Sequence, residues 1–145
     1  MTQEEKELLL KDLSSRLPYG VKCQWGTYYE GTLIDVCKCK TEHGFVYWDC
    51  YFEECGDDVP IEIVKPYLRT ISSITEEERV EIGKAIQKDR IEPYGEIKSS
   101  GSDNLLLCTI RQAHNLMVWL LKNHFDFNGL IERGLAINCT DLNIY

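Results

Sequence analysis

Four cysteines lie close together in the first half of the sequence, Cys37, Cys39, Cys50 and Cys55. Thiolate sulfur is a preferred ligand of Zn²⁺, which four such groups can surround tetrahedrally. The paired C-x2-C spacing of zinc knuckles is absent, however. In an alternating strand Cys37 and Cys39 also share a face with Leu33, which we expect to be buried. We therefore interpret these cysteines as free core thiols, assign no metal site and no cofactor, and keep a zinc-stabilised module as an alternative.

An acidic segment, Glu53–Pro60, follows these residues and contains Asp57 and Asp58 beside Gly56. Carboxylate oxygens at short spacing can bind Ca²⁺. The spacing here fits no recognised calcium-binding loop, so we interpret the segment as a solvated acidic loop.

No group of residues predicts a catalytic site. The sequence contains no glycine-rich phosphate loop, no G-x-S-x-G and no H-E-x-x-H motif. Cys108 and His114, on one predicted helix, would point about 120° apart and could not act as a dyad. A second hypothesis is nevertheless a small enzyme with its site between the sheet and the long helix. Its candidate residues are Asp35, Asp49, His114 and His124.

Aromatic side chains are frequent in the predicted strand region. Because strand alternation sends side chains to both faces, some of these rings should be exposed. Exposed aromatics beside an acidic loop are typical of a protein-binding surface. The alternative is that the rings cover a small core. The predicted binding residues are Trp25, Tyr47, Trp48, Tyr51, Asp57 and Asp58.

Composition limits the possible partners. The chain has 145 residues, of which 43% are hydrophobic and 28% charged, as expected for one folded domain. Its 16 basic and 24 acidic residues give a net charge of −8, which disfavours nucleic-acid binding but suits a protein with a basic face. The segment Met1–Leu13 lacks the features of a secretory signal, so we expect a cytoplasmic protein. The apolar segment Asn104–Leu121 carries Arg111 and His114, so we expect no membrane span.

The N-terminal half predicts one helix followed by a sheet. Thr2 and Glu5 form a capping box at the start of a helix that ends near Leu17, before Pro18. Alternating and β-branched residues then predict short strands in an antiparallel meander. The predicted strands are 21–25, 32–40, 45–52 and 61–64, with a hairpin turn at 42–44 and Pro66 ending the last strand.

The C-terminal half predicts two helices and a tail. A second capping box, Thr75 with Glu78, begins a peripheral helix to about residue 89. Residues 90–103 form a linker before the helix 104–121, whose wide apolar face requires two or more packing neighbours. The tail 124–138 should dock on the sheet through Phe125, Phe127, Leu130 and Leu135.

We therefore predict an α+β fold, with an N-terminal helix, an antiparallel meander or half-barrel of four to five strands, two helices and a short docked tail. Residues 1–145 form a single domain in this interpretation. Helix and sheet occupy 1–72, the peripheral helix and linker 73–103, and the core helix and tail 104–145.

Three segments carry a resemblance to a known group. They are LLKDLSSRLPYGVKCQ (9–24), KPYLRTISSITEEE (65–78) and VWLLKNHFDFNGLIERGLAIN (118–138). Together they resemble a widespread group of small proteins of gut anaerobes, often encoded in prophages and mobile elements. The resemblance implies no activity, cofactor or catalytic residue. It favours a non-enzymatic binding or accessory protein of phage or mobile-element origin that acts through protein–protein contacts.

Overall fold

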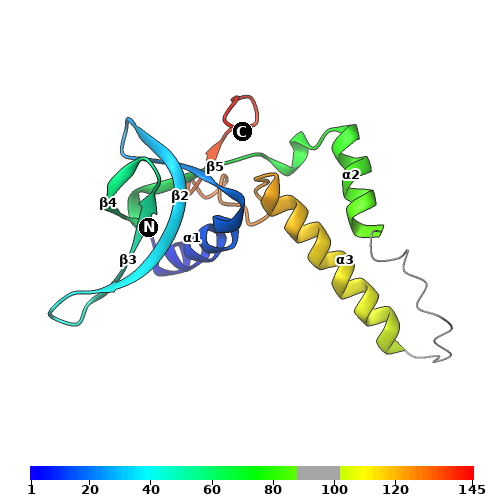
Figure 1. The fold of residues 1–145 in the computed structure, drawn as a ribbon, viewed down its shortest axis with the longest axis horizontal. Coiled ribbons are helices and arrows are strands. Elements are labelled where there is room, and N and C mark those ends of the chain that lie inside the picture. Colours follow the sequence, from blue (N-terminus) through cyan, green and yellow to red (C-terminus); the bar gives the residue numbers. More distant parts are fainter. Residues whose placement is uncertain (88–101) are drawn as a thin grey trace.

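The computed structural model describes residues 1–87 and 102–145, and all their side chains except those of 87 and 102–109. These residues form an α+β fold that begins with a helix, continues as a sheet and ends with two further helices and a tail (Figure 1). The elements are α1 (Gln3–Arg16), β1 (Lys22–Trp25), β2 (Tyr29–Lys40), β3 (Val46–Phe52), β4 (Cys55–Pro60), β5 (Val64–Leu68), α2 (Glu76–Gln87), α3 (Ser102–Lys122) and β6 (Ile137–Asn138), with 3₁₀ turns η1 (Leu17–Tyr19), η2 (Ile61–Ile63) and η3 (Ile71–Ser73).

The described strands form one sheet in the order β4-β3-β2-β1-β5-β6. All neighbouring pairs are antiparallel except β5 and β6, which run parallel. The long strand β2 pairs with β1 through its first residues and with β3 through the rest. A register shift between Leu33 and Asp35 lies where it changes partner, and β2 curves strongly in Figure 1. The predicted α+β class and curled sheet are confirmed.

Helix α1 begins as predicted. Thr2 and Glu5 form the capping box, each side chain bonded to the other's backbone amide. Leu9 and Leu13 are fully buried against the sheet. They belong to one core formed by Leu9, Leu13, Val21, Cys23, Trp25, Leu33, Cys50, Phe52, Val59, Ile61, Val64, Leu68, Leu130, Leu135 and Ala136.

Two strand predictions need correction. The segment interpreted as an acidic loop contains β4, whose Val59 lies opposite Cys50 and is buried. Residues 61–63 form a 3₁₀ turn, and the strand β5 runs through Pro66 instead of ending there. Since β6 pairs only with Tyr67 and Leu68, β5 is an edge strand at Pro66, where a proline is tolerated.

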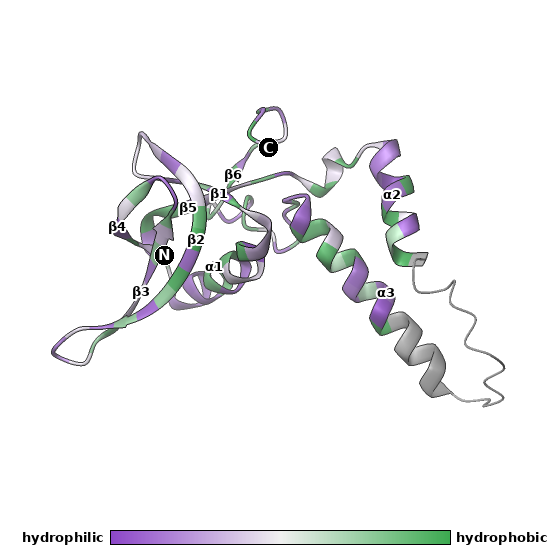
Figure 2. Cartoon of the chain, viewed as in Figure 1, coloured by the Kyte–Doolittle hydropathy of each residue, from purple (hydrophilic) through white to green (hydrophobic). Residues whose placement is uncertain are grey.

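Helix α3 forms where the apolar spacing predicted it, but it is not a core helix. Ile110 is 55% exposed and Met117 50% exposed, and of its described side chains only Leu121 is buried. Figures 1 and 2 show α3 extending away from the sheet with α2 beside it, and Asn115 bonds to the Ala85 carbonyl between them. The covering neighbours expected for its wide apolar face are therefore mostly absent from the described residues.

The predicted linker 90–103 falls largely outside the described residues. Within the described part, no helix combines the length and the apolar character that a membrane crossing requires. The capping box of Thr75 and Glu78 is present at the start of α2. Glu78 is also bound by Arg69 at 2.7 and 3.2 Å, which connects α2 to the end of β5.

The tail docks on the sheet as predicted. Phe125 and Leu130 are fully buried, Leu135 is nearly so, and Phe127 is half-buried. Backbone bonds between Arg69 and residues 124 and 126 extend the parallel pairing of β5 with β6. The tail therefore completes one edge of the sheet as well as covering its core.

Candidate functional site

The candidate site is built around the tight turn between β1 and β2. Gly26 adopts φ of +62°, a conformation that favours glycine, and it allows the chain to reverse directly after Trp25. Trp25 and Tyr29 are therefore cross-strand partners, with their rings stacked at a centroid distance of 6.2 Å. Thr27 and Tyr28 form the tip of the turn and are exposed.

Trp25 is held from several sides. Its other face stacks on Phe52 with ring centroids 4.1 Å apart. A Cβ atom added to Gly31 would approach the Trp25 ring to 3.2 Å and the Glu54 carboxylate to 2.3 Å, so a larger residue here would displace the Glu54 side chain and press on the ring. Glu54 is fixed by the Thr32 amide, which donates to its carboxylate at 2.8 Å. Trp25 is thus a rigid wall and not a mobile surface ring.

A cavity of about 440 Å³ lies beside this wall. Strand β4 and turn η2 form its opposite side. The pairing of β3 with β4 is irregular at Asp57 and Asp58, where Asp57 is exposed and Asp58 interacts with the Tyr51 hydroxyl. The lining residues are Trp25, Gly26, Tyr29, Cys55, Asp57, Asp58, Val59, Pro60 and Ile63.

Large apolar side chains at the cavity and next to it face solvent: Tyr29 and Ile63 line the cavity, and Tyr28 precedes Tyr29 in the chain. Tyr28 is 89% exposed, Tyr29 65% and Ile63 51%. We refer to these three residues as the apolar rim. Isolated exposed apolar residues are ordinary, but two of them at a cavity with a third next to them in the chain mark a candidate binding surface. None of these three residues is in the predicted binding set. The adjacent tyrosines shortly after Gly26 were a signal that could have indicated them.

The structure divides the six predicted binding residues between two places. Trp25, Asp57 and Asp58 line the cavity, although Trp25 is only 8% exposed and contributes mainly to the core. The other three lie on β3, away from the cavity. Tyr47 and Tyr51 share the face opposite to the core, whereas Trp48 packs partly against the core with Lys38 5.9 Å above its ring. The predicted set is thus not one continuous patch.

The register shift in β2 separates the four clustered cysteines. Beyond it, Val36 pairs with fully buried Cys50, while Cys37 pairs with Asp49. Cys37 and Cys39 therefore project from the face opposite to Cys50. Strict alternation predicted that they share the face of Leu33, and the register shift makes that prediction wrong. Within the described part of the chain, no three His, Cys, Asp or Glu side chains are grouped closely enough to hold a metal ion.

Several thiols and one tyrosine of this sheet have raised pKa values. Burial raises the pKa of the Cys50 thiol to about 12 and also raises that of Cys23. A hydrogen bond to Asp35 is the main cause that raises the pKa of Cys37. Loss of hydration, together with a hydrogen bond to Asp58, raises the pKa of Tyr51 to about 12. Reactive cysteines have lowered pKa values, so these thiols are poor nucleophiles.

The four residues of the enzyme hypothesis are not brought together. Asp35 and Asp49 lie on neighbouring strands, His114 is exposed on α3, and His124 is buried after the end of α3. None of them lines the cavity beside Trp25 or the second cavity described next.

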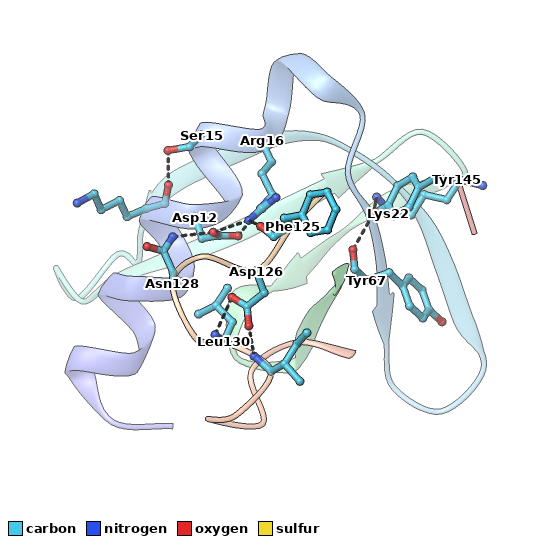
Figure 3. A network of polar contacts seen from close by, with 12 residues as sticks. Asp12, Ser15, Arg16, Lys22, Tyr67, Phe125, Asp126, Asn128, Leu130 and Tyr145 are labelled. Carbon is cyan, nitrogen blue, oxygen red and sulfur yellow. Dashed lines mark hydrogen bonds and ion pairs between the residues drawn. The ribbon is translucent and has the colours of Figure 1, made fainter. Parts of the chain in front are cut away.

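A second cavity, of about 510 Å³, lies beside the tail and is lined by Phe127, Ile131 and the buried Asp126. Both carboxylate oxygens of Asp126 accept backbone amides, from Leu130 at 2.9 Å and Ile131 at 2.8 Å. Figure 3 shows this cap within the polar network of the tail. Because the Asp126 carboxylate already accepts these two backbone hydrogen bonds, the second cavity is a weaker candidate for a binding site.

The network in Figure 3 continues into α1. Asp12 and Arg16 are fully buried and form two bonds, at 2.6 and 3.0 Å. Arg16 also donates to the Phe125 carbonyl at 2.8 Å, and Asn128 donates to Asp12 at 2.8 Å. These contacts fasten the tail to α1, so we interpret the network as structural.

Comparisons of the chain with protein-family models, curated proteins and solved structures gave no significant match.

Proposed function

We propose that this chain is a non-enzymatic binding or accessory protein whose partner protein contacts the apolar rim and the cavity beside it. The observation that carries the proposal is that the exposed side chains of Tyr29 and Ile63 line a cavity with a rigid Trp25 wall, with exposed Tyr28 next to Tyr29 in the chain. Tyrosine is enriched in binding hot spots because its ring gives a large contact area and its hydroxyl a hydrogen bond. A rigid wall such as Trp25 lowers the entropy lost on binding.

The charge of the chain supports a protein partner with a basic surface. With a net charge of −8, the molecule attracts such surfaces and repels a phosphate backbone. The sequence resemblance adds an origin in phages or other mobile elements to the proposal. A cytoplasmic accessory protein or an inhibitor of a host system is the role that fits these features together.

Affinity capture from a host-cell lysate tests this proposal with three baits, the wild-type chain, Tyr29→Ala and Phe45→Ala. Phe45 is a matched control because it is 74% exposed and lies just past the far end of β2, whose first residue is Tyr29. We expect a specific partner that wild type and Phe45→Ala retain and Tyr29→Ala loses. Removing a hot-spot tyrosine costs about 2 kcal/mol or more, roughly thirtyfold in affinity.

The circular dichroism and melting temperature of both variants should match wild type, since each removed ring is largely exposed. A partner that Phe45→Ala loses and Tyr29→Ala keeps would move the binding surface to the hairpin, near Tyr47. The same captured proteins with all three baits would contradict a specific surface on this sheet.

A further inference from the structure

We infer that the cavity between Trp25, Tyr29 and Asp57 receives the cationic end of a lysine or arginine side chain from the partner protein. This inference rests on the proposed function and names what the cavity recognises. It follows from the walls of the cavity, from the state of its carboxylates, and from a contrast with other aromatic rings of the same chain.

The two sides of the cavity differ in chemistry. Trp25 and Tyr29 supply aromatic rings on one side, and the acidic residues Asp57 and Asp58 line the other. Val59, Pro60 and Ile63 add apolar surface, while no lysine, arginine or histidine is among the lining residues. A long basic side chain matches this arrangement, because its methylene groups suit the apolar surface and its charged end suits the carboxylates. An anionic ligand would be repelled.

The Asp57 carboxylate is available to a ligand. Lys6 binds Glu62, Arg16 binds Asp12 and Arg69 binds Glu78, but neither Asp57 nor Asp58 has an ion-pair partner among the described residues. Asp58 interacts with the Tyr51 hydroxyl instead. Asp57 lines the cavity and is exposed, so a cation can approach it without displacing an existing ion-pair partner.

The aromatic rings of this chain give an informative contrast. Phe125, Phe127 and Trp48 each have a basic side chain of the same chain above the ring, at 4.3, 5.6 and 5.9 Å. Among the described residues no such cation lies over Tyr29, whereas both faces of Trp25 are already covered by the Phe52 and Tyr29 rings. Tyr29 stacks on Trp25 through one face only and is 65% exposed. Its exposed ring lines the same cavity as Asp57 and is therefore suited to a cation from outside the chain.

Nuclear magnetic resonance titration with small cations tests the inference. The probes are n-butylammonium for lysine, methylguanidinium for arginine, and choline with its neutral isostere 3,3-dimethylbutan-1-ol. The signals followed are the Trp25 indole N–H and the Tyr28, Tyr29 and Asp57 amides. We expect saturable shifts at these positions with the cations, and binding of the neutral isostere about fivefold weaker or more. Added salt should weaken the cation binding.

Asp57→Asn and Asp141→Asn form a matched pair of variants. Both remove one negative charge from an exposed position, but only Asp57 lines the cavity. We expect Asp57→Asn to weaken cation binding about three- to tenfold and Asp141→Asn to leave it within twofold. Equal effects of the two variants, equal binding of choline and its neutral isostere, or no saturable shift with any cation would overturn the inference.

The cavity inference and the proposed function fail in distinguishable ways. If Tyr29→Ala loses a captured partner but no cation binds, the protein-binding role stands and the cationic anchor is wrong. If the cations bind at Trp25 but no partner depends on Tyr29, the cavity chemistry stands and the proposed function is wrong.

Discussion

At the scale of single residues, His124 shows how burial sets a protonation state. Its ring stacks on Tyr145 with centroids 3.7 Å apart, and its backbone has φ of +57°. Burial, helped by the nearby positive charge of Arg16, lowers the pKa of His124 from 6.5 to about 4. The histidine is therefore a neutral packing residue at neutral pH and not a general base poised near pH 7.

This shift predicts a pH dependence of stability. The unfolded chain binds a proton at His124 with a pKa of about 6.5, whereas the folded chain resists protonation until about pH 4. The free energy of unfolding should therefore fall as the pH drops from about 6.5 to 4, and this contribution should be constant above pH 7. Denaturant unfolding at pH 7.5, 6.5, 5.5 and 4.5 measures the trend.

His124→Asn isolates the contribution of this residue, because asparagine tolerates a positive φ. The variant should lose the pH dependence between pH 6.5 and 5, whatever its absolute stability. Glu5, Glu62 and Glu78 have lowered pKa values, so both proteins should lose stability together below about pH 4.5. Identical slopes for wild type and variant above pH 5 would contradict the assignment.

At the scale of elements, the tail contributes more to the core than the long helix α3 does. Phe125 is fully buried, stacks on Trp119 at 5.6 Å, and has the Arg69 guanidinium 4.3 Å above its ring. Phe127, two residues later, is half-buried at the wall of the second cavity with Arg16 5.6 Å from its ring. The two phenylalanines therefore stabilise the fold to different degrees.

Phe125→Ala should lower the free energy of unfolding by about 3–5 kcal/mol, the range for a phenylalanine removed from a filled core. Phe127→Ala should cost less, about 1–2 kcal/mol, because part of its surface already faces solvent. Urea unfolding monitored by circular dichroism gives both values. A larger loss for Phe127→Ala than for Phe125→Ala would mean that the tail docks through different contacts in solution.

At the scale of the whole molecule, the described residues divide into a packed part and an extended part. Helix α1, the sheet and the tail supply the core cluster, whereas none of the described residues of α2 is buried. Figure 1 shows α2 and α3 extending from one end of the sheet. Local stability should follow this division, since segments with few buried contacts open more readily.

Hydrogen–deuterium exchange should therefore rank the elements. We expect the slowest amide exchange in β1, in the first half of β2 and in α1, and the fastest exchange among the described helices in α2. Exchange of α2 as slow as that of β1 would contradict the prediction and would indicate a packing partner for the α2–α3 pair.

Sequence patterns predicted those features that depend on near neighbours along the chain. The two capping boxes join residues three positions apart, so the starts of α1 and α2 could be read directly. The turn at Glu42–Gly44 and the helical spacing within α3 were equally local. Docking of the tail followed from its apolar composition. Asp57 and Asp58 entered the candidate site only because acidic residues stood out beside aromatic strands.

Tertiary structure alone decided the features that depend on distant residues. Strand β4 has one buried side chain, Val59, and becomes a strand because β3 supplies its hydrogen bonds. The register shift in β2 turns Cys37 and Cys39 away from the core, since one extra residue exchanges the two faces of a strand. Helical periodicity in α3 predicted an apolar face, but it could not predict that few of the described residues would pack against that face. The cavity beside Trp25 exists because the curled sheet brings β4 opposite the β1–β2 turn. Patterns between near neighbours in the sequence cannot predict this contact, because the two segments are far apart along the chain.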